Sequence, residues 1–407
     1  MAARNAIPRW HGVPVYLTST PGGIASQMDQ ARALGSTAVT LFAQWNAIEP
    51  SAKGQYDVSN LELLDRAVLD ASDRGLKVLL RVRGSPCWAS TEPPAAKAAR
   101  PDLCQAYPPE NPKDFGDFVG LLASRYAGRL AGIEIWPEPD HADGQHLAGP
   151  DRPGHFAALL KAAHTAVIQS SAPVPVLIGA LTGANGNFLK ALYRDGIKGS
   201  YEGVAVDFYD IVLASVRSIH QLQLANGDST PVWEEEFGWI TCTAHPTIDE
   251  RYFVCVNPQQ QARNLDDAFR GMAGVPWIAG AIVFTLRDSP TLHFGISDAQ
   301  GNPKPAFAQL QQDFLRGVGP THPVTVRMGR ANGSRAVVGT APVGDVISLQ
   351  VKPPAGRPGR TFNAYLRLTV YGTFTWPLPA KVGKGWRVYA LQTWTGRHAS
   401  MVIGRGK

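Results

Sequence analysis

The chain lacks an apolar run long enough to cross a membrane. Its longest nearly apolar stretch, residues 274–286, is interrupted by glycine, proline and threonine, whereas a membrane helix needs about 20 apolar residues. Residues 1–12 also lack the charged-then-apolar pattern of a secretory signal. Either the protein is not exported by that route or the sequence begins after the signal. With 407 residues, 44% hydrophobic and 18% charged, the chain is expected to fold around one large core.

Several motifs that would define a cofactor or metal site are also absent. There is no G-x-x-x-x-G-K-[ST] phosphate loop, no G-x-S-x-G nucleophile elbow and no C-x-x-C pair. The glycine cluster at Gly179, Gly183 and Gly186 has neither the spacing nor the position of a dinucleotide fingerprint. We therefore interpret that cluster as a loop, and we expect neither a metal nor a cofactor.

Cysteine is scarce, with four residues at Cys87, Cys104, Cys242 and Cys255. Two local disulfides, Cys87 to Cys104 and Cys242 to Cys255, would each close one loop, and the even number suits an oxidising compartment. We therefore expect an extracellular or cell-surface protein. Four cysteines allow three pairings, and four reduced, buried thiols are the alternative.

Acidic residues are nearly missing from the last part of the chain. Residues 319–407 carry thirteen lysines and arginines against a single acid, Asp345, whereas residues 1–318 carry 26 bases and 32 acids. This segregation favours an anionic partner for the C-terminal part, such as an acidic glycan or a cell wall. Nucleic acid is disfavoured because no recognisable binding module is present. The alternative is a solvated cationic surface without a ligand.

The hydrophobic periodicity predicts strands that alternate with helices. Eight such strands, most separated by a helix, over residues 1–318 predict an α/β fold, a (β/α)8 TIM barrel. An open doubly wound sheet is disfavoured because the nucleotide fingerprint is missing. The strands are expected at 13–19, 37–45, 77–83, 132–136, 175–181, 204–209, 231–238 and 280–286, and the helices at 60–74, 114–126, 155–169 and 259–272.

From residue 319 the pattern changes to short alternating runs separated by glycine and proline. The runs at 324–328, 346–351, 364–371 and 386–393 predict a small C-terminal all-β domain, basic and sandwich-like, over residues 319–407. Most of its aromatic side chains are expected to form its core, and a sugar-stacking platform is the alternative.

Two predicted strands end in glutamate, at the barrel mouth where reactive groups gather. Strand four closes at Glu138 and strand seven at Glu236, and two opposed carboxylates are what glycosidic bond cleavage requires. The alternative is that such acids are structural partners of Arg81 or Arg83. We prefer that alternative for Glu234, which we place one layer deeper in the barrel.

Six segments of the barrel resemble the retaining glycoside hydrolases of clan A, most closely the barrels of families thirty-nine and five. They are W-x-x-I-E-P-x-x-x-G-x-Y-D at 45–57, P-x-W at 86–88, F-V-x-L-L-A-S-R-Y at 118–126, E-I-W-x-E-P at 134–139, W-x-x-E-F-G-W at 233–239 and F-G-I-S-D-x-x-G-x-P-K-P-A at 294–306. The resemblance implies that Glu138 is the general acid/base, Glu236 is the nucleophile, and the anomeric configuration is retained. That mechanism needs the two carboxyl groups about 5–5.5 Å apart, with Glu138 kept protonated by burial and by the charge of Glu236.

The chain departs from this group at several positions of the sugar site. Where the group has asparagine before the acid/base, this sequence has Pro137, and where it has an arginine on strand two, this sequence has Thr40. Asp207 replaces a histidine, Phe284 or Leu286 replaces a tryptophan, and Tyr209 keeps a tyrosine that contacts the nucleophile.

The expected activity is hydrolysis of a polysaccharide, and the departures suggest an unusual sugar such as a furanoside or an acidic residue. A non-catalytic carbohydrate-binding or attachment protein and a transglycosidase are the alternatives. The residues expected to contact the sugar are Trp45, Trp88, Trp136, Asp140, Asp207, Tyr209, Trp239 and Phe284.

Overall fold

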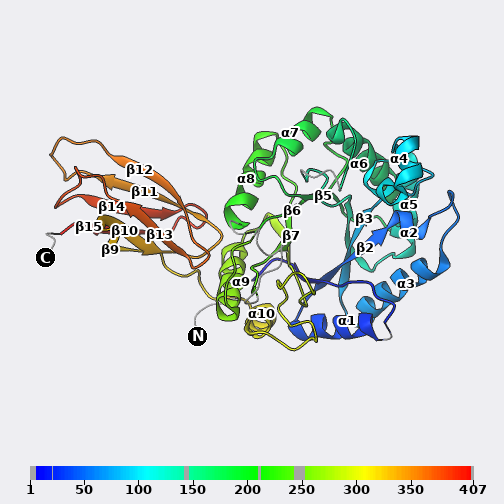
Figure 1. Ribbon diagram of the computed structural model, residues 1–407, viewed down its shortest axis with the longest axis horizontal. Coiled ribbons are helices and arrows are strands. Elements are labelled where there is room, and N and C mark those ends of the chain that lie inside the picture. The colour runs from blue at the N-terminus through cyan, green and yellow to red at the C-terminus, as the bar shows by residue number, and fades with distance from the viewer. Residues whose placement is uncertain (1–5, 21, 142–145, 210–211, 243–252, 405–407) are drawn as a thin grey trace.

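The structure, a computed structural model, describes residues 6–20, 22–141, 146–209, 212–242 and 253–404. Eight parallel strands form a closed barrel in the order of the sequence (Figure 1). This confirms the predicted (β/α)8 barrel. The strands are β1 (Trp10–Pro14), β2 (Ala38–Gln44), β3 (Lys77–Arg83), β4 (Leu130–Ile135), β5 (Val176–Leu181), β6 (Gly203–Asp207), β7 (Val232–Phe237) and β8 (Ile278–Val283).

Helices surround the barrel, and several of them lie outside the segments predicted as helical. The four predicted helices correspond to α3 (Val58–Asp73), α5 (Pro112–Arg125), α6 (Arg152–Ile168) and α9 (Pro258–Met272). The others are α1 (Gly23–Leu34), α2 (Trp45–Ile48), α4 (Pro94–Ala99), the 3₁₀ turn η1 (Pro101–Ala106), α7 (Asn187–Arg194), α8 (Val212–Ala225) and α10 (Pro305–Arg316). In the described part, no helix is both long and apolar enough to span a bilayer.

Strand β3 illustrates how the sequence pattern builds the barrel wall. Its side chains alternate, because Val78, Leu80 and Val82 join the core formed with the helices, whereas Leu79 packs in the barrel interior. Alternation of this kind follows from the two-residue repeat of a strand. The same repeat turns Arg81 toward the barrel axis, where it meets acids of other strands.

The floor of the barrel is closed by one large side chain packed against glycine. Trp233 of β7 lies in the interior cluster with Leu79 and Leu177. A Cβ added to Gly280 of β8 would lie 2.3 Å from Cε3 of Trp233. The indole therefore occupies the space that any larger residue at position 280 would need.

The C-terminal part folds as predicted into antiparallel β-structure, beside the barrel in Figure 1. One sheet has the order β13-β10-β9 and the other the order β12-β11-β14-β15, and their inner faces share a separate hydrophobic core. The strands are β9 (Thr325–Ala331), β10 (Ser334–Thr340), β11 (Val346–Lys352), β12 (Phe362–Arg367), β13 (Thr373–Pro377), β14 (Arg387–Gln392) and β15 (His398–Val402).

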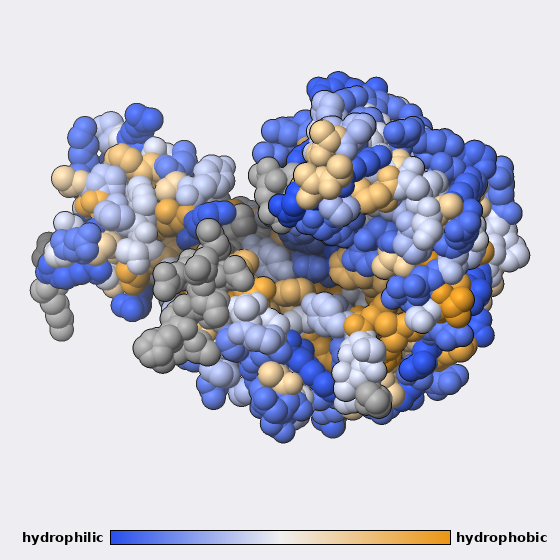
Figure 2. Space-filling view, turned by 45° about the vertical axis from the view of Figure 1, so that its right-hand side comes forward, coloured by the Kyte–Doolittle hydropathy of each residue, from blue (hydrophilic) through white to orange (hydrophobic). Residues whose placement is uncertain are grey.

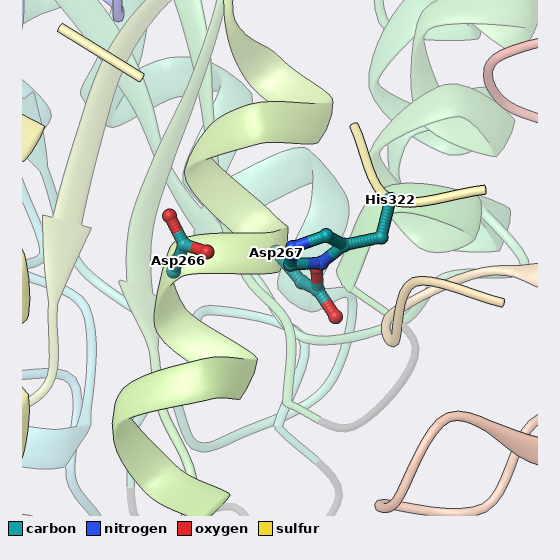
Figure 3. A group of neighbouring side chains, drawn as sticks. All are labelled: Asp266, Asp267 and His322. Carbon is teal, nitrogen blue, oxygen red and sulfur yellow. The ribbon is translucent and has the colours of Figure 1, made fainter. Parts of the chain in front are cut away.

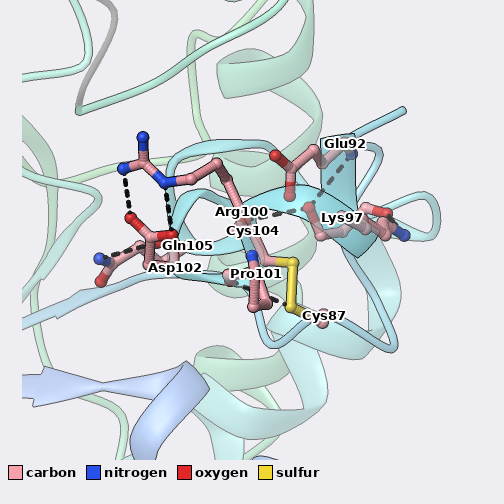
Figure 4. Close-up of a disulfide and its surroundings, with 9 residues drawn as sticks. Cys87, Glu92, Lys97, Arg100, Pro101, Asp102, Cys104 and Gln105 are labelled. Atoms are coloured by element: carbon pink, nitrogen blue, oxygen red, sulfur yellow. Dashed lines mark hydrogen bonds and ion pairs between the residues drawn. A yellow bond between two sulfur atoms is a disulfide. The ribbon is translucent and has the colours of Figure 1, made fainter. Parts of the chain in front are cut away.

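Two disulfides join Cys87 to Cys104 and Cys242 to Cys255, so the expected pairings are confirmed and the reading with reduced thiols is wrong. Figure 4 shows the first disulfide tying the segment after β3 to the turn η1. Beside it, the hydroxyl of Ser90 donates to the carbonyl of Cys104 at 2.9 Å.

Candidate active site

The centre of the barrel holds one arginine among four acids. The Arg81 side chain, which is 2% exposed, lies 3.1 Å from Glu134, 2.8 Å from Glu235, 2.5 Å from Glu236 and 3.5 Å from Asp207. The buried Glu134 and Glu235 are therefore structural partners of Arg81, which is the alternative given above for acids at the strand ends. A single guanidinium cannot neutralise four carboxylates in a buried site.

The end of β7 departs from regular strand geometry. The pairing of β7 with β6 shifts register between Val206 and Asp207 of β6. The pairing of β7 with β8 shifts register between Glu234 and Phe237 of β7. Because of this irregularity, the neighbouring residues Glu235 and Glu236 both reach Arg81. Glu235, and not the predicted Glu234, is therefore the deeper β7 acid that pairs with Arg81.

Glu234 has a different environment from the one expected. Its Oε1 accepts a hydrogen bond from the backbone N–H of Phe208 at 2.9 Å, and it forms no ion pair with Arg81 among the described contacts. Burial raises the pKa of Glu234 well above its ordinary value. It therefore acts as a protonated link between β7 and the end of β6.

Burial raises the pKa of three of the acids around Arg81, namely Glu134, Asp207 and Glu235, and their negative neighbours add to that rise. The pKa of Arg81 would be lowered by burial, but the surrounding acids raise it well above its usual range. The cluster therefore combines one permanent positive charge with acids whose protonated form burial favours.

Glu236 is fixed at both carboxylate oxygens while remaining accessible. Oε1 lies 2.5 Å from Nη1 of Arg81, and Oε2 accepts from the Tyr209 hydroxyl at 2.9 Å. Its side chain is 17% exposed. Burial and the charge of Glu236 raise the pKa of Tyr209 well above its usual value, so the phenol stays a donor. The clan A group has an arginine on strand two, where this chain has Thr40. Here Arg81 on β3 supplies the guanidinium that contacts Glu236.

Glu138 follows β4 in an unusual backbone conformation. Both Trp136 and Glu138 have positive φ, 51° and 52°, on either side of Pro137. The N–H of Glu138 donates to the carbonyl of Ala180 at 2.9 Å, which joins the turn to β5. Non-glycine residues rarely adopt this conformation. Here it turns a side chain that is 23% exposed toward the cavity.

The protonation expected for Glu138 is not what its surroundings favour. Burial raises its pKa, but the hydrogen bond and charge of His146, at 3.0 Å, outweigh burial, and His141 and Arg81 act in the same direction. The pKa of Glu138 is therefore lowered. The expected protonation rested on burial and on the charge of Glu236, whereas the structure adds two histidines, His141 and His146, from the loop that follows.

A cavity of about 600 Å³ opens beside Glu138. It brings together four of the predicted residues, Glu138, Asp207, Tyr209 and Phe284. Figure 2 shows this face of the barrel hollowed, with hydrophobic surface along the hollow and hydrophilic surface at its rim. The lining residues that the sequence argument missed include His141, Thr182, Phe253, Phe294 and Arg367.

Three of the four predicted tryptophan cleft walls belong to the core. Trp45, Trp136 and Trp239 are at most 2% exposed. Trp45 packs against Trp88 and Phe115, with ring centroids 5.6 and 5.7 Å apart. The prediction that these three stack on sugar is wrong, because spacing along the chain marks strand ends but not burial. Trp88 is partly exposed, and its indole donates to the carbonyl of Glu49.

Asp140, another predicted sugar contact, is engaged by the protein. Its Oδ1 accepts from the N–H and the hydroxyl of Thr182 at 2.9 and 3.2 Å, and its Oδ2 accepts from the N–H of Gly183 at 2.9 Å. These three hydrogen bonds tie the loop after β4 to the loop after β5. Asp140 thus positions the loop that carries Glu138.

Two groups of side chains have the donor types of a metal site. In the first, Asp207, Glu235 and Glu236 converge, and the Arg81 guanidinium already lies among them. The second comprises Asp266, Asp267 and His322, and Figure 3 shows Asp267 turned toward His322.

Protein groups already satisfy the acids of the second group. Asp266 pairs with Arg270 at 2.7 Å, and Asp267 pairs with His322 at 2.5 Å. In both groups, protein cations make the contacts that an ion would make.

The fold is similar to those of solved glycoside hydrolases. A family 39 glycoside hydrolase from Bacteroides cellulosilyticus aligns with a TM-score of 0.58 at 15% identity, over 98% of this chain and 81% of that one. A family 39 β-xylosidase from Caulobacter crescentus gives 0.56 at 17% identity, over 86% and 84%. A family 30 endoxylanase from Clostridium papyrosolvens gives 0.54 at 14% identity, over 93% and 95%.

No protein-family model and no curated protein sequence matches the chain. The structural likenesses nevertheless show that it has the barrel fold of the clan A glycoside hydrolases, which the six sequence segments implied.

Proposed function

We propose that the protein is a retaining glycoside hydrolase that acts on a polysaccharide. The observation that supports this proposal is the solvent exposure of two carboxylates. Among the described acids that surround Arg81 or flank the cavity mouth, the side chains of Glu134, Asp207 and Glu235 are fully buried, whereas those of Glu138 and Glu236 are 23% and 17% exposed. Of these five acids, Glu138 and Glu236 have the most exposed side chains, and of these two only Glu138 is among the described residues that line the cavity.

In the first step, a carboxylate oxygen of Glu236 attacks the anomeric carbon and the bond to the leaving oxygen breaks. Arg81 and Tyr209 hold Glu236 in orientation through one oxygen each. Glu138 gives a proton to the leaving oxygen. In the second step, Glu138 takes a proton from water, which attacks the anomeric carbon and releases Glu236.

His146 orients the acid/base. Its Nδ1 lies 3.0 Å from Oε2 of Glu138, and this contact lowers the pKa of Glu138. A bound sugar that displaces water from the cavity disfavours the ionised form of Glu138, which favours its protonation next to the leaving oxygen. His146 is therefore a positioning residue for Glu138.

The test replaces each carboxylate by its amide. Glu138→Gln and Glu236→Gln should each abolish release of reducing ends from a panel of plant, algal and bacterial polysaccharides. An activated aryl glycoside, which needs no acid, should recover cleavage in the Glu138 variant far more than in the Glu236 variant. Glu62→Gln, on the exposed side of α3, is the matched control. If both active-site variants remain active, the proposal fails.

The second candidate is a carbohydrate-binding protein on a hydrolase barrel. The lowered pKa of Glu138 and the loss of a side-chain donor at Pro137 favour it. It predicts heat of binding for a glycan in calorimetry with no product from any glycan of the panel. Turnover of any member of the panel would exclude this candidate.

We further propose that the protein works outside the cell, where the two disulfides persist, and that the basic C-terminal domain holds it on an anionic glycan or wall. Its exposed arginines and lysines support this part of the proposal.

A further inference from the structure

The catalytic cavity has one wall residue from the other domain. Arg367, the last residue of β12, lines the cavity together with Glu138 and Tyr209, although some 230 positions separate Arg367 from Glu138 in the sequence. Its side chain is exposed, and it has no ion pair or hydrogen bond with the residues that the structure describes. Among the described residues that line the cavity, Arg367 is the one lysine or arginine, and Arg81 is committed to the buried acids.

The domain that carries Arg367 is held on the barrel by specific contacts. The indole N–H of Trp394 donates to the carbonyl of Gly271 at 2.8 Å, and the amide of Asn264 donates to the carbonyl of Val370 at 3.0 Å. Trp394 also packs against Trp277, with ring centroids 5.6 Å apart. These contacts lie on the same side of the domain as the end of β12, so they fix Arg367 at the cavity rim.

The sheet beyond Arg367 continues this surface away from the cavity. Along β12, the exposed residues alternate as Asn363, Tyr365 and Arg367, and Tyr365 is 78% exposed. Across the sheet, the ammonium of Lys352 lies 5.2 Å from the ring of Tyr389. An exposed aromatic ring next to a guanidinium suits a sugar that carries a negative charge.

Negative charge is missing from this surface. Asp345 is the only acid of residues 319–407, and it is fully buried, where it accepts hydrogen bonds from the Thr393 hydroxyl and the Trp394 N–H. The barrel side of the cavity, in contrast, presents the partly exposed carboxylate of Glu138. An anionic substrate group is therefore repelled by Glu138 and attracted to the rim at Arg367.

We propose that Arg367 completes the substrate site and that the substrate is an acidic polysaccharide, whose anionic group pairs with Arg367 while the chain continues over Tyr365. The guanidinium fork matches a carboxylate or a sulfate through two parallel hydrogen bonds. That the bound glycan is also the hydrolysed substrate rests on the proposed function. Its recognition by Arg367 is a binding property that can be measured without hydrolysis.

The experiment measures binding of the full chain to immobilised glycans, followed by calorimetry with the glycans that bind. The probes are polygalacturonate and alginate for carboxylates, chondroitin sulfate and dextran sulfate for sulfates, and xylan and dextran as neutral glycans. The variants are Arg367→Ala and Arg367→Lys, and the matched control is Arg360→Ala. Arg360 is an exposed arginine just before the other end of β12, so its loss changes net charge equally.

We expect acidic glycans to bind and neutral glycans not to bind. Arg367→Ala should weaken the affinity for the acidic glycan by about tenfold, the scale of one charge-assisted hydrogen bond. Arg367→Lys should recover part of that loss, and Arg360→Ala should change binding less than twofold. Selective binding of the carboxylated or of the sulfated glycans identifies the group that Arg367 reads.

Three results would overturn the proposal: neutral glycans bind as well as acidic ones, no acidic glycan binds, or the Arg367 and Arg360 variants lose affinity equally. Loss of hydrolysis in every preparation, with Arg367-dependent binding intact, would instead refute the proposed function and leave this binding site standing.

Discussion

Arginine behaves differently in the two domains of this protein. In the barrel, Arg81 is 2% exposed and contacts four acids. In the C-terminal domain, Arg367 is exposed at the cavity rim and has no ion pair with a described residue. A buried guanidinium organises its neighbours and has no capacity left for a ligand, whereas an exposed one remains available for recognition.

The same contrast holds for the acids. The barrel gathers carboxylates at its centre, where burial raises the pKa of Asp207 and Glu235 well above their ordinary values. The C-terminal domain has one acid, Asp345, and seals it inside. Acids are thus gathered in the buried centre of the barrel, whereas the surface of the C-terminal domain carries basic side chains.

The largest effect should come from removing the buried arginine. Arg81→Met leaves several buried acids without their cation, so the free energy of unfolding should fall by about 3–5 kcal/mol. Arg360→Met, at an exposed site of the basic domain, should change it by less than about 0.5 kcal/mol. Urea unfolding of both variants measures the difference. Equal stability of the two would mean that the buried cluster does not depend on Arg81.

Removing a disulfide should affect the barrel and spare the other domain. Both disulfides lie in the barrel chain, and the first closes a loop with a sequence separation of 17. The double variant Cys87→Ser and Cys104→Ser should lose about 3 kcal/mol of barrel stability. Hydrogen exchange should show faster exchange in the loop between β3 and α5 and unchanged protection in β11 and β14. Equal loss of protection in both domains would show that the C-terminal domain does not unfold independently of the barrel.

A glycine pair compares packing in the two domains. Gly280→Ala places a Cβ against the ring of Trp233 and should cost about 1–3 kcal/mol. Gly383→Ala, in the C-terminal domain, meets no atom within 4 Å and should be nearly neutral. Thermal unfolding of both variants tests this. The packing account fails if the Gly280 variant melts at the wild-type temperature.

The smallest effect concerns the contact between the domains. The hydrogen bond to Asp267 raises the pKa of His322. Burial and, more weakly, the charge of Arg270 oppose this rise, whereas the charges of Asp267 and Asp266 support it. The stability that this pair contributes is therefore complete below the ordinary pKa of histidine, about 6.5, and is lost as the pH rises through the raised pKa.

His322→Gln should flatten this part of the dependence of the melting temperature on pH. A wild-type slope that persists unchanged in the variant would show that other groups cause it. Because the His322 side chain is 52% exposed, the difference should be small and should shrink in high salt.

The fold could be predicted because its signals are local. The prediction of a strand at residues 77–83 is confirmed by β3, whose consecutive Val78, Leu79 and Leu80 form the apolar run that is typical of a parallel strand buried on both faces. The first strand was placed at 13–19 but lies at Trp10–Pro14. Its apolar pattern continues beyond the barrel, where the N–H of Val15 still bonds to the carbonyl of Thr40, so periodicity alone could not locate its end.

The site could be predicted only where it follows the end of a strand. The position of Glu138 and Glu236 at the mouth comes from that rule. Glu235 was missed because the shift in pairing of β7 cannot be read from alternation. His146 comes from a loop and Arg367 from another domain, and no sequence period connects either of them to the barrel.

The most direct test of the account is to trap the glycosyl-enzyme. An activated fluorinated glycoside of the sugar that the enzyme cleaves should accumulate as a covalent adduct, and peptide mass spectrometry should locate it. We predict one adduct, on Glu236, and none in Glu236→Gln. An adduct on the neighbouring Glu235, or cleavage with inversion and no adduct, would contradict the assignment of Glu236 as the nucleophile.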